Sequence, residues 1–244
     1  MDEPNAAVHF PVEQSRPIAV ITGASSGIGL AIAEELSVTH KLVLIGRDGS
    51  KLEDIANRFE QAESIVLDVT GDIDATALPM AERGVDVLVH SAGMSLRGPA
   101  ATVTRPQWRE SFELNLFAVA ELTRLLLPAL RRSSGTVVVL NSGAGLFTSQ
   151  KNSIYCATKH ALRAYADVLR EEERANGVRV TSIHPGYVDT AMARDIAAFE
   201  GGEYQPETYL RPSSVAAAVR LAVDASEEAM IESLSIRPRV PVKM

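Results

Sequence analysis

The stretch Thr22-Gly23-Ala24-Ser25-Ser26-Gly27-Ile28-Gly29 sets the fold class of this chain. It follows an apolar run, residues 18–22, that predicts a β-strand, and it opens a pattern typical of a helix. Glycines at such a turn let the backbone approach a pyrophosphate closely, and free N–H groups at the start of a helix attract its negative charge. A glycine-rich turn can also be purely structural, so the stretch alone leaves both interpretations open.

Short β-branched runs alternate with longer helical patterns from residue 18 onward. This alternation is typical of repeated βαβ units and predicts a mostly parallel sheet. Seven strands are expected, at Ile18–Thr22, Leu42–Ile45, Ser64–Val69, Val85–His90, Thr136–Asn141, Arg179–His184 and Ile231–Ile236. The longest helices are expected at about residues 106–131 and 153–176, ended by Gly135 and Gly177.

Length and composition limit the classes of function. A chain of 244 residues, 46% of them hydrophobic, can bury one large core. We expect a flexible leader, residues 1–16, and a single domain, residues 17–244. With a net charge of −7 and no stripe of Lys and Arg, the chain is not expected to bind nucleic acid. No apolar run is long enough to cross a membrane, and one cysteine fits a reducing compartment, so we expect a cytoplasmic protein.

A second group of polar residues follows the predicted fifth strand. Tyr155 and Lys159 stand four residues apart on a predicted helix, so they share a face. A nearby ammonium favours phenolate, and we therefore expect Lys159 to lower the pKa of Tyr155 toward a range useful for acid–base chemistry. Ser142, at a strand end, is placed to hold a substrate oxygen beside them. These groups suit the transfer of a proton that accompanies the transfer of a hydride.

In the order and spacing of these motifs the chain resembles the short-chain dehydrogenase/reductase family over about residues 17–237. The resemblance rests on residues 22–29, Asp68, Ser91-Ala92-Gly93, Asn115, Ser142, Tyr155, Lys159 and Pro185-Gly186. It implies an α/β fold with a Rossmann-like, doubly wound sheet of seven parallel strands in the order 3-2-1-4-5-6-7. Helices would cover both faces in three α/β/α layers.

The resemblance also implies the site residues. Tyr155 would exchange a proton with the substrate oxygen, Ser142 would hydrogen-bond that oxygen, and Lys159 would bind the nicotinamide ribose. Asn115 would hold a water that links Lys159 to solvent. The expected cofactor-binding set is Gly23, Ser25, Ser26, Gly27, Ile28, Gly29, Arg47, Asp68, Val69, Ala92, Gly93, Tyr155, Lys159, Pro185, Gly186, Val188 and Thr190. No catalytic metal is expected, and His90-Ser91 departs from the family's usual Asn-Asn.

The end of the second predicted strand bears on the choice between NAD and NADP. An acidic residue there binds the ribose 2′-OH of NAD, whereas an arginine accommodates the 2′-phosphate of NADP. Gly46 occupies the position of the acid and Arg47 follows it, which favours NADP(H). Asp48 is close enough in sequence to reach the ribose, so NAD(H) stays possible.

The expected substrate pocket is mainly apolar. Its candidates are Ser95, Leu96, Ala144, Leu146, Phe147, Asn152, Tyr187 and Met192. No Arg or Lys is clearly placed to hold an anion, which favours a neutral ketone, aldehyde or secondary alcohol, although Arg97, Lys151 or Arg194 could swing in. Residues 190–211 are expected to form a mobile lid, or alternatively an ordinary surface helix and loop.

Three functional hypotheses follow. The first is an NADP(H)-dependent carbonyl reductase or alcohol dehydrogenase, and the second an NAD-dependent alcohol, sugar or steroid dehydrogenase. The third is a redox sensor that binds the nucleotide without turnover, but such a module needs no proton path. The resemblance further implies a homodimer or homotetramer. Apolar candidates for its contacts are Ala118, Leu122, Leu125, Leu126, Tyr165 and Leu169.

Overall fold

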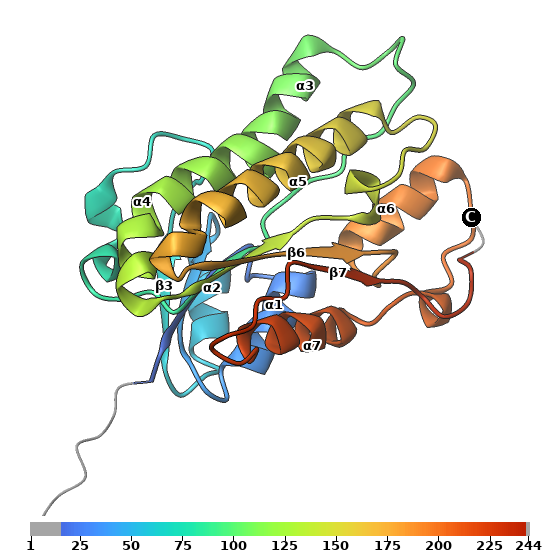
Figure 1. Cartoon of the computed structure of the whole chain (residues 1–244). Helices are drawn as coiled ribbons and strands as arrows, with labels where there is room; N and C mark the ends of the chain where they lie inside the picture. The colour runs from blue at the N-terminus through green and yellow to red at the C-terminus, as the bar shows by residue number, and fades with distance from the viewer. Residues whose placement is uncertain (1–15, 243–244) are drawn as a thin grey trace, which may run out of the picture.

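A computed structural model describes residues 16–242, which form three α/β/α layers around one sheet (Figure 1). All seven strands are parallel and run in the order β3-β2-β1-β4-β5-β6-β7, which confirms the expected Rossmann-like topology. The strands are β1 (Ile18–Thr22), β2 (Lys41–Gly46), β3 (Ala62–Val66), β4 (Val87–His90), β5 (Thr136–Leu140), β6 (Arg179–Pro185) and β7 (Ser233–Ile236). The strand order reverses between β1 and β4, and this reversal places a crevice at their carboxyl ends. The expected leader lies outside the described residues, apart from Arg16.

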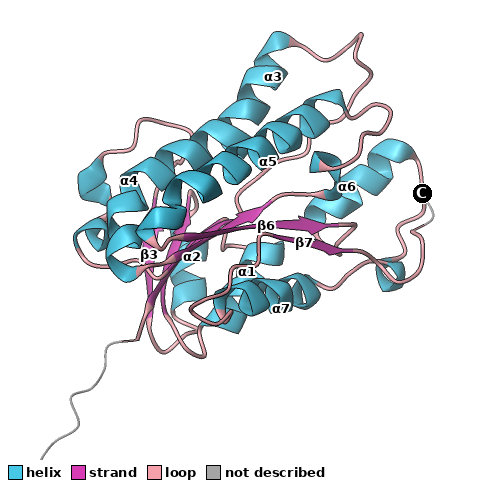
Figure 2. Cartoon of the chain, in the orientation of Figure 1, coloured by secondary structure: helices cyan, strands magenta, loops and turns pink. Residues whose placement is uncertain are grey.

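Helices cover both faces of the sheet (Figure 2). On one face lie α1 (Gly27–Leu36), α2 (Gly49–Ala56) and α7 (Pro212–Val223), and on the other α3 (Arg105–Phe112), α4 (Ala118–Ser133) and α5 (Ser153–Glu173). Helix α6 (Ala191–Glu200) follows β6 and lies beyond the carboxyl end of that strand. No helix among residues 16–242 is both long and apolar enough to cross a membrane.

Side chains of the central strands alternate between two hydrophobic cores. In β1, Ala19 and Ile21 belong to the core beneath α1 and α7, whereas Val20 belongs to the core beneath α4 and α5. Each of these three residues is fully buried. Because both faces are covered, the central strands read as continuous apolar runs rather than as alternating ones. The edge strand β3 has exposed positions, which explains its weaker apolar pattern.

Some element boundaries differ from those expected. Strand β3 ends at Val66 because its partner β2 ends at Gly46, so residues 67–69 lead away from the sheet. Strand β4 begins at Val87 and β7 at Ser233, each two residues later than predicted. Ser134, with φ of 48°, caps α4 in the left-handed conformation, so the helix ends one residue before the expected Gly135. The predicted helix 106–131 contains a π-helical segment, Glu113–Phe117, between α3 and α4.

The apolar residues considered for subunit contacts face inward. Ala118, Leu122, Leu126 and Leu169 are buried in the core beneath α4 and α5, and Leu125 and Tyr165 pack against it. They therefore stabilise the chain itself, and the expected homo-oligomer stays a prediction.

Candidate active site

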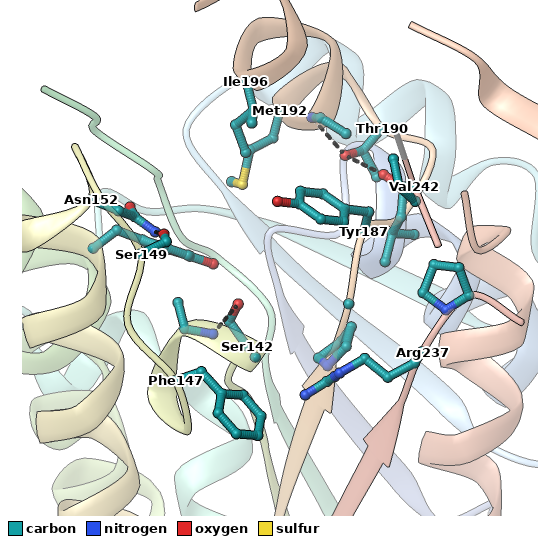
Figure 3. A pocket seen from close by; sticks show the side chains of 18 of the residues that line it. Ser142, Phe147, Ser149, Asn152, Tyr187, Thr190, Met192, Ile196, Arg237 and Val242 are labelled. Atoms are coloured by element: carbon teal, nitrogen blue, oxygen red, sulfur yellow. Dashed lines mark hydrogen bonds between the residues drawn. The ribbon is translucent and has the colours of Figure 1, made fainter. Parts of the chain in front are cut away.

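A cavity of about 420 Å³ opens beyond the carboxyl ends of β5 and β6 (Figure 3). Its size suits a small-molecule ligand. The loops after β5 and β6 supply Ser142 and Tyr187, the start of α5 supplies Tyr155, and α6 supplies Met192. The cavity also reaches Ile28 in the first turn of α1, so it adjoins the glycine-rich stretch that opened the sequence.

The glycine-rich turn is shaped by close backbone contacts. Gly23 has φ of 68°, and a Cβ atom there would lie 2.8 Å from the backbone nitrogen of Ala92. A Cβ on Gly29 would lie only 2.2 Å from the Gly23 carbonyl oxygen. The turn is fixed to the loop after β4, because Thr22 Oγ1 accepts hydrogen bonds from the backbone N–H groups of Ser91 and Ala92, at 3.1 and 3.2 Å. Only glycine fits positions 23 and 29 in this arrangement.

The first turn of α1 leaves its backbone donors available. Ser26 is the N-cap residue, and its side chain makes no capping hydrogen bond. The N–H groups at a helix start and the positive end of its dipole form an anion site when no side chain occupies them. The cradle from Gly23 to Gly29 therefore fits the pyrophosphate of a dinucleotide. Gly27 approaches Thr190, whose Cγ2 would lie 3.3 Å from a Cβ at position 27, so this cradle meets the loop after β6.

Three charged residues lie near the end of β2. Arg47 follows Gly46, and no carboxylate in the described part of the chain forms an ion pair with it. Asp48 is the N-cap of α2 and accepts a hydrogen bond from Lys51 N–H at 3.1 Å. Asp68 accepts hydrogen bonds from the Thr70 hydroxyl and backbone N–H, and these bonds lower the pKa of its carboxyl. The neighbouring Val69 is buried in the core.

The predicted reacting groups come together at the cavity wall. Ser142 follows β5, and both Ser142 and Tyr155 line the cavity. The Ser142 hydroxyl accepts a hydrogen bond from Ala144 N–H at 3.1 Å and lies near enough to the Tyr155 phenol to oppose a rise of its pKa. Lys159 lies one turn further along α5, with its Nζ 5.8 Å from the centre of the Tyr155 ring. This buried ammonium donates a hydrogen bond to the Leu140 carbonyl at 2.8 Å. The predicted grouping of Ser142, Tyr155 and Lys159 is therefore present in space.

The electrostatics of this group differ from the expectation. Burial raises the pKa of Tyr155 above its usual value, and the contact with Ser142 and the charge of Arg97 oppose this shift only in part. The expected lowering of the Tyr155 pKa by Lys159 is wrong for this structure. Burial also lowers the pKa of Lys159 to about 8, because the ammonium loses solvation without gaining a carboxylate partner. At neutral pH the phenol therefore carries its proton.

Asn115 connects the loop after β4 with α5. It lies in the π-helical segment, where its Nδ2 donates hydrogen bonds to Met94 O at 2.9 Å and Thr158 Oγ1 at 3.1 Å. Its Oδ1 accepts from Met94 N–H at 2.9 Å and would lie 3.2 Å from a Cβ on Gly93. π-Segments are frequent at functional sites, and this one holds a buried amide against Met94 and Thr158, the latter next to Lys159 in the chain.

His90 and Ser91, which stand where the family usually has two asparagines, are both held by local hydrogen bonds. His90 Nε2 lies 2.8 Å from Thr123 Oγ1 and so ties β4 to α4, and burial lowers the pKa of His90 to about 3. Ser91 is held through its backbone by Thr22. The neutral imidazole thus joins the sheet to α4 at this position.

The loop after β6 closes the opposite side of the cavity. Pro185 ends β6, and the Gly186 N–H donates to Ile236 O at 2.7 Å, which continues the pairing with β7. Val188 is buried, and Thr190 caps α6 by accepting a hydrogen bond from Ala193 N–H at 3.3 Å (Figure 3). This loop leads directly into the expected lid.

The pocket prediction is confirmed for some residues and wrong for others. Ala144, Phe147, Asn152, Tyr187 and Met192 line the cavity, whereas Ser95, Leu96 and Leu146 are not among its lining residues. Sequence reasoning missed the C-terminal contribution, Arg237, Pro238, Val240, Pro241 and Val242. No motif or periodicity marks this tail.

Comparisons with known proteins show the family to which this chain belongs. The family model for short chain dehydrogenases matches residues 17–201. An uncharacterized oxidoreductase of Staphylococcus epidermidis is 34% identical over 228 residues, which cover 91% of this chain and 96% of that protein. The chain therefore belongs to the short-chain dehydrogenase family and is an oxidoreductase.

Two solved structures are similar throughout. An alcohol dehydrogenase from the archaeon Thermococcus sibiricus, complexed with 5-hydroxy-NADP, has a TM-score of 0.81 at 28% identity over 93% of this chain and 99% of that one. A putative NAD(P)-dependent gluconate 5-dehydrogenase from Beutenbergia cavernae, with bound NADP, has a TM-score of 0.81 at 30% identity. The match covers 94% of this chain and 98% of that one.

Proposed function

We propose that this protein is an NADP(H)-dependent oxidoreductase that interconverts a neutral ketone or aldehyde and the corresponding alcohol. The observation that carries the proposal is that Ser142 and Tyr155 line one cavity, with the Lys159 ammonium 5.8 Å from the centre of the Tyr155 ring. A proton donor and an oxygen-binding hydroxyl thus face a space that a small carbonyl compound can enter, and a cation lies beside the phenol.

The residues divide the work of carbonyl reduction. When bound, the nicotinamide supplies a hydride to the carbonyl carbon. Tyr155 donates its phenolic proton to the carbonyl oxygen as the C=O π bond opens, so an alcohol forms and a phenolate remains. Ser142 hydrogen-bonds the same oxygen while negative charge develops on it. Lys159 stabilises the phenolate and positions the nicotinamide ribose, and Asn115 holds the water through which the phenolate regains a proton.

The preference for NADP(H) rests on the end of β2. Arg47 is free of ion pairs with the described residues, and its guanidinium matches the geometry of a phosphate. Asp48 is the residue that could bind the ribose of NAD, and its carboxylate instead accepts a hydrogen bond from Lys51 N–H as the N-cap of α2. The structural relatives with bound 5-hydroxy-NADP and NADP support the same choice.

The direct test is cofactor oxidation by the purified protein with a panel of neutral ketones and aldehydes. We expect NADPH consumption that requires both protein and carbonyl compound. Binding of NADPH without turnover over a broad panel would favour the alternative of a nucleotide-binding redox sensor. If the protein bound neither NADPH nor NADH, the proposal would be overturned.

The cytoplasmic location stays a prediction.

Replacing Arg47 by Gln should separate the two cofactors. A charged hydrogen-bond partner for a phosphate contributes about 1.5–3 kcal/mol, so the KM for NADPH should rise roughly 10- to 100-fold. The KM for NADH should change by less than about threefold, since NADH has no 2′-phosphate. Arg83→Gln, which removes an exposed guanidinium elsewhere, serves as control. Equal effects of Arg47→Gln on the two cofactors would contradict this role.

The charge of Lys159 should make cofactor binding depend on pH. Its pKa is about 8, so the ammonium is present below that value and is lost as the pH rises through it. If the ammonium binds the ribose hydroxyls, the Kd for NADPH should change little from about pH 7, where the 2′-phosphate is already ionised, up to about pH 8, and should increase above it. A fluorescence titration across this range measures the profile. Lys159→Met should bind NADPH more weakly with no such step, and a step that persists in this variant would assign it to another group.

A further inference from the structure

Arg97 and Asn152 both line the cavity although they come from different loops. Gly98 and Asn152 are paired in a parallel bridge, and Gly98 N–H donates a hydrogen bond to Lys151 O at 2.8 Å. This bridge joins the loop after β4 to the loop before α5. Both Arg97 and Asn152 line the cavity as a result.

Each of the two side chains carries a buried polar atom without a partner among the described residues. The Arg97 side chain is 9% exposed, and its Nε–H donates no hydrogen bond. Asn152 is 3% exposed, and its Oδ1 accepts none, while its Nδ2 donates to Ser149 Oγ at 3.2 Å. Asn152 does not cap α5 with its side chain, so helix capping does not explain its amide. Buried polar atoms are normally paired, and an unpaired donor and acceptor in one cavity wall indicate a ligand that satisfies both.

Glu200 determines the charge of this wall. It is the last residue of α6 and forms an ion pair with Arg97, which joins the predicted lid to the loop after β4. The guanidinium is therefore already neutralised by a carboxylate that is 26% exposed. A substrate carboxylate at this position would face Glu200 and the Asn152 carbonyl oxygen, both of which are acceptors. A hydroxyl group donates one hydrogen bond and accepts another, so it satisfies both unpaired atoms without adding charge.

We propose that the substrate is a neutral carbonyl compound with a hydroxyl group close to the reacting carbon, and that Arg97 and Asn152 recognise this hydroxyl. Arg97 Nε–H donates to the hydroxyl oxygen, and Asn152 Oδ1 accepts its hydrogen. Glu200 excludes carboxylates from the same position. Arg97 and Asn152 line the same cavity as Tyr155, and Asn152 directly precedes α5, three residues before Tyr155, so the recognition point lies on the side of the cavity where the carbonyl reacts. This inference rests on the proposed carbonyl chemistry and names its substrate class.

Matched four-carbon ketones test the hydroxyl. The probes are 1-hydroxybutan-2-one and 4-hydroxybutan-2-one, butan-2-one without the hydroxyl, and 2-oxobutanoate and 3-oxobutanoate with a carboxylate in its place. For the wild-type protein with NADPH, at least one hydroxyketone should exceed butan-2-one in kcat/KM by about tenfold or more, and both oxobutanoates should fall below it. Equal kcat/KM values for the hydroxyketones and butan-2-one would overturn the inference and leave the reductase proposal intact. If larger carbonyl compounds are reduced but none of these five is, the inference is likewise overturned, whereas no reduction of any carbonyl compound would overturn both.

Variants assign the recognition to the two side chains. In Arg97→Gln and in Asn152→Ala, the ratio of kcat/KM between hydroxyketone and butan-2-one should fall to within about threefold of one. The ratio compares two substrates in the same variant, so a smaller fraction of folded protein lowers both kcat/KM values equally and leaves the ratio unchanged. A ratio that stays at its wild-type value in both variants would overturn the assignment.

Glu200→Gln tests the exclusion of carboxylates. It should raise kcat/KM for an oxobutanoate relative to butan-2-one by about tenfold or more, because Arg97 then lacks its carboxylate partner. Glu203→Gln removes the same charge from an exposed residue of the same segment, and we expect it to leave this ratio unchanged. If Glu200→Gln and Glu203→Gln gave the same ratio of kcat/KM between oxobutanoate and butan-2-one, Glu200 would have no role in excluding carboxylates.

Discussion

Replacing Tyr155 by Phe is expected to lower kcat/KM for carbonyl reduction by about a thousandfold, because the carbonyl oxygen then lacks its proton donor. The aromatic ring keeps its packing, so NADPH binding measured by fluorescence should stay within about threefold of wild type. The raised pKa of Tyr155 keeps the phenol protonated at neutral pH. Reduction by the wild-type protein should therefore be insensitive to this group through the neutral range and decline only above the raised pKa. Alcohol oxidation needs the phenolate and should increase with pH.

Tyr165→Phe provides the matched control for that experiment. Tyr165 lies on the same helix and packs against the core beneath α4 and α5, and it is not among the residues that line the cavity. The same atom is removed from the same residue type, and activity should change by less than about twofold. If Tyr155→Phe retained a tenth or more of wild-type kcat/KM, the proton donor would have to be another group.

Much of the fold and part of the site could be predicted from local sequence patterns. The strands appear in the sequence as apolar runs because helices bury both of their faces. The turn appears as a glycine-rich stretch because positions 23 and 29 admit no side chain. The four-residue spacing of Tyr155 and Lys159 fixed their shared helical face. Each of these properties leaves a local mark in the sequence, as an apolar run, a glycine or a fixed spacing, even where the contact that requires it comes from a distant residue.

The remaining features depend on contacts that sequence spacing does not encode. The direction of the Tyr155 pKa shift follows from how deeply the folded chain buries the phenol, so reasoning from Lys159 alone gave the wrong sign. Arg97 and Glu200 are 103 residues apart, and only the meeting of two loops with the end of α6 makes them a pair. The π-helical segment at Asn115 is one residue per turn wider than an α-helix, a difference too small for the apolar pattern to reveal.

Replacing Gly29 by Ala should have the second large effect, on cofactor binding and on stability together. The new methyl group would lie 2.2 Å from the Gly23 carbonyl oxygen. That oxygen is a backbone atom, and the methyl carbon is bonded directly to the backbone, so neither can rotate away. The turn from Gly23 to α1 must therefore shift, and overpacking of this kind costs about 1–3 kcal/mol. Because the same turn forms the proposed pyrophosphate cradle, we expect the Kd for NADPH to increase by at least about tenfold and the Tm to fall.

Gly71→Ala distinguishes this effect from a general cost of removing a glycine. A Cβ at position 71 has its nearest contact at 3.8 Å, with Asp68 O, which is an ordinary van der Waals distance. It should leave both the Tm and the Kd for NADPH near wild type. Titration of both cofactors then separates two origins of the Gly29→Ala defect. An equal loss of NADPH and NADH affinity is expected, since the pyrophosphate is common to both, whereas a loss confined to NADPH would place the disturbance at Arg47 instead. Wild-type affinity for both cofactors in Gly29→Ala would mean that the pyrophosphate binds elsewhere.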